Sequence, residues 1–180
     1  DVGPDDRVLA LSELSFDLSV YDIFGVLAAG GTVVFPDQDL VKDPAHWVTL
    51  VQRHRVTLWN SVPQLAGLLV EEVESGEAQI DSLRAVLMSG DWIPTTLPDR
   101  IRALCPGGAT EGSIWSIWYE IDHVDPSWRS IPYGVAMPGQ RMYVLTPAGE
   151  HAPVGVPGEI HIGGAGVALN YWRDPELTAA

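Results

Sequence analysis

Two glycine-rich segments contain the residues of this sequence that are best suited to ligand chemistry. They run from Gly107 to Glu111 and from Gly163 to Gly166. Glycine lets a backbone approach a ligand closely, but it equally serves tight turns that need a positive φ. In the first segment, Thr110 and Glu111 add a hydroxyl and a carboxylate, which can meet a nucleotide and its Mg²⁺. The first segment is therefore a candidate nucleotide site, with a purely structural turn as the open alternative, and the second is expected to be structural.

Other catalytic signatures are absent from the sequence. It contains no G-x-S-x-G, H-E-x-x-H, paired C-x-x-C or full G-x-G-x-x-G motif. The five histidines lack metal-site spacing and Cys105 is the single cysteine, so a zinc centre is not expected. Lys42 is the only lysine and lies outside any phosphate-binding pattern. If the protein handles ATP, most compensation of the phosphate charge must come from other groups.

Composition excludes several classes of function. The 180 residues are 46% hydrophobic and 19% charged, which is typical of a folded globular chain. A formal net charge of -14 disfavours binding to nucleic acid or to anionic lipid. The uncharged stretch at residues 23–35 is too short to span a bilayer, and no basic, apolar leader is expected. With a single cysteine, the sequence favours a reducing compartment, so we expect a cytoplasmic protein.

The elements that must position these residues follow an α/β pattern. Strands are predicted at 8–14, 32–35, 56–62 and 84–88, and helices at 20–29, 44–53, from 63 onward and at 94–104. After residue 114 the helical period is lost, and strands are predicted at 114–121, 140–145 and 159–162. The sequence therefore predicts a layered α/β part followed by a mostly β part, without a linker that would mark a domain boundary.

Two of the helices are predicted from their apolar stripes. The stripe of helix 20–29 consists of Ile23, Phe24, Leu27 and Ala28. The stripe of the helix that begins at Pro63 consists of Leu65, Leu68 and Leu69. These side chains are expected to face the sheet.

Four motifs, in this order, resemble the adenylate-forming superfamily. They are Ser15-Phe16-Asp17-Leu18-Ser19, Gly108-Ala109-Thr110-Glu111, residues 158–168 and Pro175-Glu176-Leu177-Thr178. Within that superfamily the chain resembles the adenylation domain of a nonribosomal peptide synthetase, and residues 113–119 and 128–134 are similar to modules that accompany a heterocyclisation domain. The resemblance implies that residues 1–180 form part of the large N-terminal subdomain of an adenylation (AMP-binding) domain, with an α/β fold.

The resemblance also implies a reaction. Family members use ATP and Mg²⁺ to convert an amino acid into its aminoacyl-AMP, and they release pyrophosphate. The acyl group then passes to the phosphopantetheine thiol of a peptidyl carrier protein. The expected partners are thus an amino acid, a carrier protein and neighbouring synthetase domains, with neither nucleic acid nor a membrane involved.

Carried over by position, the resemblance implies a substrate pocket of eight residues. They are Asp17, Leu18, Tyr21, Asn60, Leu87, Ser89, Ile114 and Trp115. Asp17 would pair with the substrate α-ammonium in a charge-assisted contact, and a helix N-cap is its open alternative. Core packing is the alternative for Leu18, Leu87 and Ile114.

The combination of pocket residues resembles the cysteine-specifying pattern. Its apolar members would leave room for a small side chain only, and Ser89 and Asn60 could offer weak polar contacts to a thiol. Serine and threonine are close rivals of cysteine, because a pocket of this size separates isosteres poorly. We expect cysteine to be the favoured substrate.

The nucleotide assignments follow by the same carry-over. The backbone of Gly108, Ala109 and Thr110 would lie along the adenine, and Glu111 would help to hold Mg²⁺. No catalytic residue is expected within these 180 residues, and His161 and Trp172 are expected to be structural.

Two departures from the family pattern matter. The sequence as given lacks the family's phosphate-binding loop and its C-terminal subdomain with the catalytic lysine, so we expect these residues alone to be inactive. Between Cys105 and Gly108 the family also has a short strand and one further pocket residue. Of the two explanations, a true deletion or residues omitted from the sequence at this point, we expect the second.

Two other functions stay open on the sequence alone. A degenerate adenylation domain would act as a scaffold, and a disrupted region around Gly108 would favour it. An aryl or acyl ligase would not need a carboxylate at Asp17 for an amine. Replacing Asp17 with alanine should therefore separate an amino-acid enzyme from an acyl ligase.

Overall fold

The computed structural model describes residues 2–76, 78–105, 109–114 and 116–179, and for 109–114 it describes the backbone alone. The chain divides into two compact units. The first contains residues 1–114 and 119–133, and the second contains 115–118 and 134–180. The sequence pattern predicted the change of architecture near residue 114 but no domain boundary.

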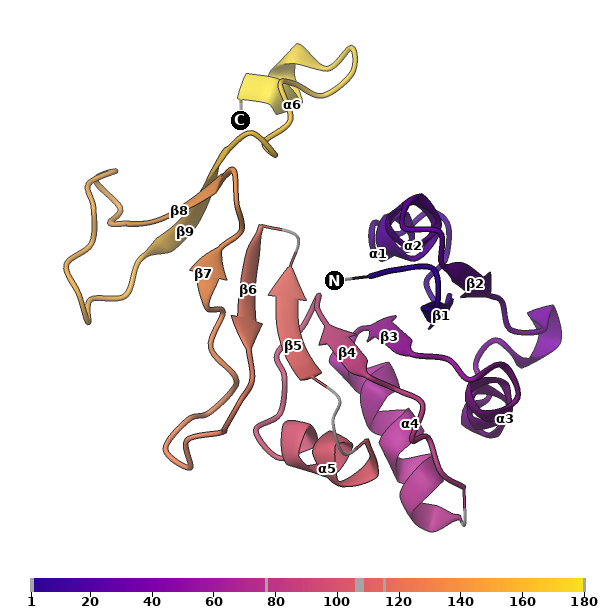
Figure 1. The fold of residues 1–180 in the computed structure, drawn as a ribbon. Helices are drawn as coiled ribbons and strands as arrows, with labels where there is room; N and C mark the ends of the chain where they lie inside the picture. The colour runs from indigo at the N-terminus through magenta and orange to yellow at the C-terminus, as the bar shows by residue number, and fades with distance from the viewer. Residues whose placement is uncertain (1, 77, 106–108, 115, 180) are drawn as a thin grey trace. The chain divides into compact units, whose positions relative to one another are not determined.

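A parallel β-sheet forms the centre of the first unit (Figure 1). Its strands are β1 (Arg7–Leu9), β2 (Thr32–Val34), β3 (Leu58–Ser61), β4 (Ala85–Met88) and β5 (Ala109–Ile114), in the spatial order β2-β1-β3-β4-β5. The helical segments between them are α1 (Leu18–Val20), η1 (Tyr21–Gly25), α2 (Val26–Ala28), η2 (Gln38–Leu40), α3 (Pro44–His54), α4 (Pro63–Ser75) and α5 (Leu97–Leu104). The α/β class predicted for this part is confirmed.

Each face of this sheet packs against different helices. Trp59 of β3 and Val86 of β4 belong to the larger hydrophobic cluster, together with buried side chains of α3, α4 and α5. On the opposite face, Val8 and Leu58 pack against Val26 of α2. The period of two along a strand thus sends alternate residues into two separate cores.

Local sequence explains where the clearest helices begin and end. The Asp43 side chain accepts a hydrogen bond of 3.0 Å from Ala45 N, and Pro44 occupies the first turn of α3. That helix ends at Arg55, whose φ of 49° is left-handed. Pro63 likewise begins α4. The predicted starts at 44 and 63 are therefore confirmed.

The buried face predicted for helix 20–29 is wrong. Phe24 and Leu27 are 69% and 54% exposed, whereas Leu18, Asp22 and Val26 are buried. Apolar side chains occur on every side of this helix, so periodicity alone did not identify the face that meets the sheet. A π-helical turn, η1, also changes the angular spacing of the residues along the segment.

The stripe predicted for α4 is also displaced. Leu69 is buried as predicted, but Leu68 is 43% exposed. The positions that meet the core are Ala66, Leu69, Val70 and Val73, which follow one another at three-, one- and three-residue intervals. Leucine is thus not the best indicator of the buried face here, since Ala66 is buried and Leu68 is exposed.

The loop expected at Gly107 to Glu111 is wrong for residues 109–111, which lie in strand β5. The backbone of Ala109, Thr110 and Glu111 lies in β5 and pairs in parallel with Ala85, Val86 and Leu87 of β4. Parallel pairing with a buried neighbouring strand supplies hydrogen bonds that outweigh the preference of a glycine-rich segment for turns. Gly107 and Gly108 lie outside the described residues, and so do the steps from Cys105 to Gly108 where residues were expected to be missing.

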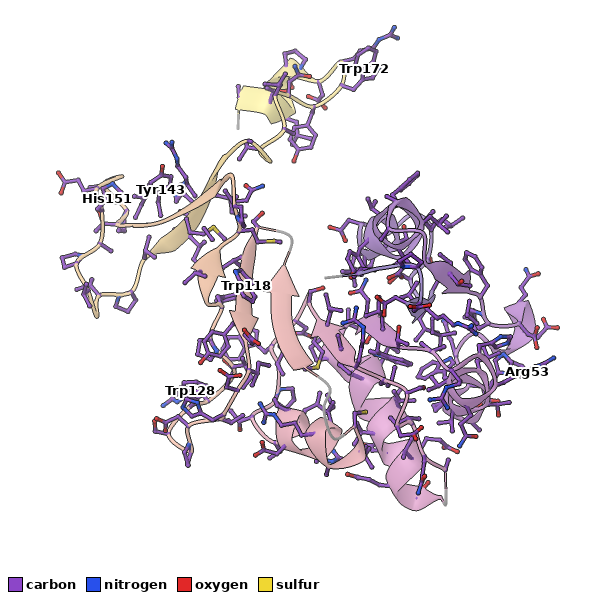
Figure 2. All side chains as sticks on the ribbon, in the orientation of Figure 1. Arg53, Trp118, Trp128, Tyr143, His151 and Trp172 are labelled. Atoms are coloured by element: carbon purple, nitrogen blue, oxygen red, sulfur yellow. The ribbon has the colours of Figure 1, made fainter. Side chains whose placement is uncertain are left out.

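The second unit is mostly β, as predicted. Ile117 and Trp118 of β6 (Ile117–Glu120) pair with β7 (Val135–Ala136). Strands β8 (Gln140–Leu145) and β9 (Glu159–Gly164) form an antiparallel hairpin, and a short helix, α6 (Pro175–Ala179), follows. Figure 2 shows Tyr143 and His151 on this hairpin, with their ring centroids 5.7 Å apart.

Gly164 has a structural role in that hairpin. Its φ is +107°, and a Cβ at this position would collide with the carbonyl oxygen of Gly139. The structural interpretation of the second glycine-rich segment therefore agrees with its geometry. Within the described part of the chain, no helix has the length and apolar character required to span a membrane.

Candidate functional site

The candidate pocket residues of the sheet lie at the carboxyl ends of neighbouring parallel strands. Asn60 of β3 is directly opposite Leu87 of β4 in the strand register, and Ser89 follows the end of β4. In open α/β sheets, ligands bind beside the carboxyl ends of the strands. Sequence-distant residues 60, 87 and 89 are thus brought together where a ligand is expected.

The helical segment after β1 brings two further pocket residues to this edge. Leu18 is buried at the start of α1, and its carbonyl oxygen accepts a long hydrogen bond of 3.4 Å from Asn60 Nδ2. Tyr21 is half-buried and packs against the cluster that contains Leu58 and Val26. Because Leu58 lies two residues before Asn60 on the same strand, Tyr21 and Asn60 belong to the same face of the sheet.

Asp17 is exposed and immediately precedes α1. It occupies the N-cap position, but its backbone is already helical and its side chain makes no capping hydrogen bond. The alternative assignment of Asp17 as a side-chain N-cap is therefore not supported. Its carboxylate is accessible to solvent and to a cationic ligand group.

Ser89 provides a buried hydroxyl. No partner for Ser89 Oγ is found among the described residues, although such a group normally forms a hydrogen bond when it is removed from water. Ser89 lines a hollow of about 380 Å³ together with Gly90, Trp92, Ser130 and Tyr133. Ser89 Oγ is therefore available to form a hydrogen bond with a ligand in this hollow.

Asp22 is a site residue that the sequence analysis missed. Its side chain is completely buried, and its Oδ1 accepts a hydrogen bond of 2.8 Å from Asn60 Nδ2. Its Oδ2 has no partner among the described residues. The available signal was a single acidic residue, four positions after Leu18, in a segment that is otherwise uncharged.

Burial dominates the electrostatics of Asp22. Loss of water disfavours its charged form and raises the pKa of the carboxyl to about 6, while the hydrogen bond from Asn60 opposes this rise. A raised pKa at a site that binds a ligand is a common functional feature, although structural networks produce it as well.

The remaining predicted site residues are not placed as side chains. Gly108 and Trp115 lie outside the described residues, and for Ala109, Thr110, Glu111 and Ile114 only the backbone of β5 is described. Leu87 pairs with Glu111 in the register, which places residue 111 next to the strand that bears the pocket residues. The nucleotide and magnesium assignments of this segment stay predictions.

Neither a reactive cysteine thiolate nor a cluster of metal ligands is found among the described side chains. Cys105 is buried, and desolvation raises the pKa of its thiol to about 11, so the reactive thiolate is disfavoured. Among the residues with described side chains, no group of three or more His, Cys, Asp or Glu is placed to hold a metal ion.

Comparison with known proteins gives a consistent family. The model of the family described as AMP-binding enzyme matches residues 1–172. Pyochelin synthetase PchF of Pseudomonas aeruginosa is 50% identical over 186 residues, which cover 99% of this chain and 10% of that protein. Pyochelin synthetase PchE of the same species is 47% identical, covering 99% of this chain and 13% of that protein.

A solved structure shows the same fold. The crystal structure of the nonribosomal peptide synthetase FmoA3 superposes with a TM-score of 0.95 at 47% identity, over 99% of this chain and 20% of that one. Its α-methyl-L-serine-AMP bound form superposes with a TM-score of 0.92 at 46% identity, over 98% of this chain and 21% of that one. The chain therefore spans between a tenth and about a fifth of the length of these relatives.

Proposed function

Because this chain belongs to the family of AMP-binding enzymes, we propose that it forms the amino-acid pocket of an adenylation domain in a nonribosomal peptide synthetase. In this proposal the 180 residues belong to the large subdomain of that domain. The similarity to pyochelin synthetases and to FmoA3 supports the choice of a synthetase over other AMP-binding enzymes.

The proposed reaction is the activation of an amino acid by ATP. A carboxylate oxygen of the amino acid attacks the α-phosphorus of ATP, the bond between that phosphorus and the oxygen that bridges the α- and β-phosphates breaks, and pyrophosphate leaves. The product, an aminoacyl-AMP, is then attacked by the phosphopantetheine thiol of a carrier protein, which yields a thioester and AMP. In this scheme the present residues bind and orient the amino acid.

Asp17 would hold the α-ammonium group of the substrate. Its exposed carboxylate, free of any capping bond, is the single observation that carries this part of the proposal. A carboxylate and an ammonium group form a charge-assisted hydrogen bond that is stronger than a neutral one. Every amino acid offers this ammonium group, so Asp17 would select for amino acids as a class.

Asn60 and Ser89 would contact the substrate side chain. Both are buried polar residues at the strand ends, and the apolar Leu18, Tyr21 and Leu87 would restrict the size of that side chain. The preferred substrate is cysteine, with serine and threonine as rivals. The α-methyl-L-serine-AMP bound by FmoA3 supports an acyl group with a small, polar side chain.

ATP would be the second substrate, and the AMPPNP-bound form of FmoA3 supports this choice. Glu111 is the one predicted Mg²⁺ ligand in the chain, and its side chain lies outside those that the structure describes. No step of the proposal depends on a metal ion held by these residues.

Substitution of Asp17 tests the proposal. Asp17→Ala, made in the longest polypeptide that carries these residues, is expected to lower amino-acid-dependent ATP-pyrophosphate exchange by about 10- to 100-fold, because the substrate ammonium group loses its charged partner. Asp39→Ala, at another exposed aspartate, is the matched control and should leave exchange unchanged. Equal exchange by the Asp17→Ala and Asp39→Ala proteins would remove Asp17 from the pocket.

A further inference from the structure

The Asn60 amide is held by two acceptors. Its Nδ2 donates a hydrogen bond of 2.8 Å to Asp22 Oδ1 and a longer one of 3.4 Å to Leu18 O. A carbonyl oxygen cannot donate, so the atom facing Leu18 O must be the amide nitrogen. The orientation of the amide therefore follows from its partners and does not depend on visible hydrogen atoms.

This orientation leaves one polar atom of Asn60 for another partner. With both amide hydrogens directed at Asp22 and Leu18, the oxygen Oδ1 is the remaining group, and no donor to it is present among the described residues. Asn60 is only 2% exposed, but its Oδ1 is not among the fully buried atoms that lack a partner, so a small ligand group can reach it. A substrate group that donates a hydrogen bond would satisfy this atom.

Asp22 is the stronger of the two amide partners. Its side chain is fully buried and lies in the π-helical turn η1, a type of local irregularity that is frequent at functional sites. A buried carboxyl with one oxygen unpaired is costly, and packing alone would favour an apolar side chain here. Its presence here is better explained by its hydrogen bond to Asn60 than by packing.

We propose that Asp22 is a positioning residue that fixes the Asn60 amide so that its oxygen accepts a hydrogen bond from the substrate side chain. The proposal rests on the function proposed above and adds a basis for specificity. It favours side chains that carry an S–H or O–H donor over side chains of the same size that carry none. Asp22 acts through Asn60 and has no contact of its own with the substrate.

The test compares cysteine with 2-aminobutyrate, in which a methyl group replaces the thiol. The measured quantity is the ratio of kcat/KM for the two amino acids in ATP-pyrophosphate exchange by the longest polypeptide that carries these residues. Asp22→Leu keeps the branching at Cγ but is larger and removes the acceptor, and it should reduce the ratio about tenfold, the value of one neutral hydrogen bond. If Asp22→Leu fails to fold, Asp22→Val is used for the same comparison.

Two further variants separate positioning from a general structural effect. Asp22→Asn keeps an oxygen acceptor and should restore the ratio to within about threefold of the unaltered protein. Val26→Ala removes a buried contact of the same helical segment without touching Asn60, so it should lower thermal stability while it leaves the ratio unchanged.

The outcomes distinguish this proposal from the function on which it rests. If no amino acid supports exchange by the unaltered protein, the proposed function fails and this inference fails with it. If exchange occurs but a folded Asp22→Leu or Asp22→Val variant keeps the original ratio, the positioning role alone is overturned. A loss of the ratio in Asp22→Asn as large as that in Asp22→Leu would also overturn it, because an acceptor oxygen would then be insufficient.

Discussion

The aromatic ring of Tyr21 lies so close to Gly25 that a Cβ built at Gly25 would be 3.0 Å from Tyr21 Cδ2. Glycine at position 25 therefore provides the space in which this predicted pocket residue rests. Glycine normally weakens a helix by about 0.5–1 kcal/mol relative to alanine, so the close approach explains its presence in this helical segment.

Gly25→Ala is expected to raise KM for the amino acid about threefold, because the Tyr21 ring must move by a few tenths of an ångström. Its effect on the free energy of unfolding should stay within about 1 kcal/mol, since the gain in helix propensity offsets the crowding. The matched control is Gly67→Ala in α4, where a Cβ meets no atom within 4 Å. This control should stabilise the protein by about 0.5–1 kcal/mol and leave KM unchanged.

Steady-state pyrophosphate exchange and denaturant unfolding of both variants provide the check. An unchanged KM in Gly25→Ala would show that the position of Tyr21 does not limit substrate binding.

A second prediction concerns the buried Asp6. Its oxygens accept hydrogen bonds of 2.6 and 2.7 Å from Arg84, and further ones from Thr57 Oγ1 and Gly3 N. These partners hold the pKa of the Asp6 carboxyl below its usual value, with the Arg84 hydrogen bonds as the main cause. The group therefore stabilises the fold above its unfolded-state pKa near 3.8, and this contribution is lost as the pH falls towards the lower, folded-state pKa.

Asp6→Asn should cost about 1.5 kcal/mol at neutral pH, because the charge-assisted hydrogen bonds from the half-exposed Arg84 become weaker. Asp99→Asn breaks an exposed pair with Arg102 and should cost less than about 1 kcal/mol. Urea unfolding at pH 7 measures both variants, and equal losses would contradict a special role for the Asp6 network.

The contribution of Asp22 to the stability of the fold should have the opposite pH dependence to that of Asp6. The pKa of its carboxyl is raised in the folded protein to about 6, so the folded state binds a proton more tightly than the unfolded state does. Stability from this group is complete below pH 3.8 and is lost as the pH rises through about 6. The full loss amounts to about 3 kcal/mol at about 1.4 kcal/mol for each pKa unit.

Asp22→Asn removes this titration, so its stability relative to the unaltered protein should rise by about 1 kcal/mol between pH 5 and pH 7. Denaturant unfolding at the two pH values measures the difference. A relative stability that is the same at both would show that Asp22 does not titrate in this range.

The parts of the fold that the sequence predicted depend on local signals. Proline at 44 and 63 determines where two helices begin, and Asp43 adds a cap, so the starts of α3 and α4 needed no tertiary information. Strand β8 has the predicted bounds, because its run of residues that favour strands ends at residues that favour turns.

The wrong predictions concern features that depend on tertiary packing, such as which face of a helix is buried. Phe24 and Leu27 are apolar but exposed, whereas the charged Asp22 is buried, because the sheet meets the other face of this helical segment. Tertiary contacts identify that face: Val26 packs against Leu58, and Asp22 accepts a hydrogen bond from Asn60. The same holds for β5, where pairing with β4 outweighs the turn preference of the glycine-rich sequence.

The candidate site was predictable in part. Resemblance supplied Leu18, Asn60 and Ser89, and the structure brings them to one edge of the sheet or to the loop that follows it. It did not supply Asp22, because the hydrogen bond to Asn60 joins residues 38 positions apart in the sequence.

We have proposed that this chain forms the pocket of an amino-acid-activating domain, with cysteine as the preferred substrate. This proposal is tested by ATP-pyrophosphate exchange by the longest polypeptide that carries these residues, with cysteine, serine, threonine and an aryl acid compared at equal concentration. Exchange with cysteine is expected to be at least about tenfold above that with each of the other three. Exchange that depends on the aryl acid, or none with any of the four from a folded protein, would contradict it.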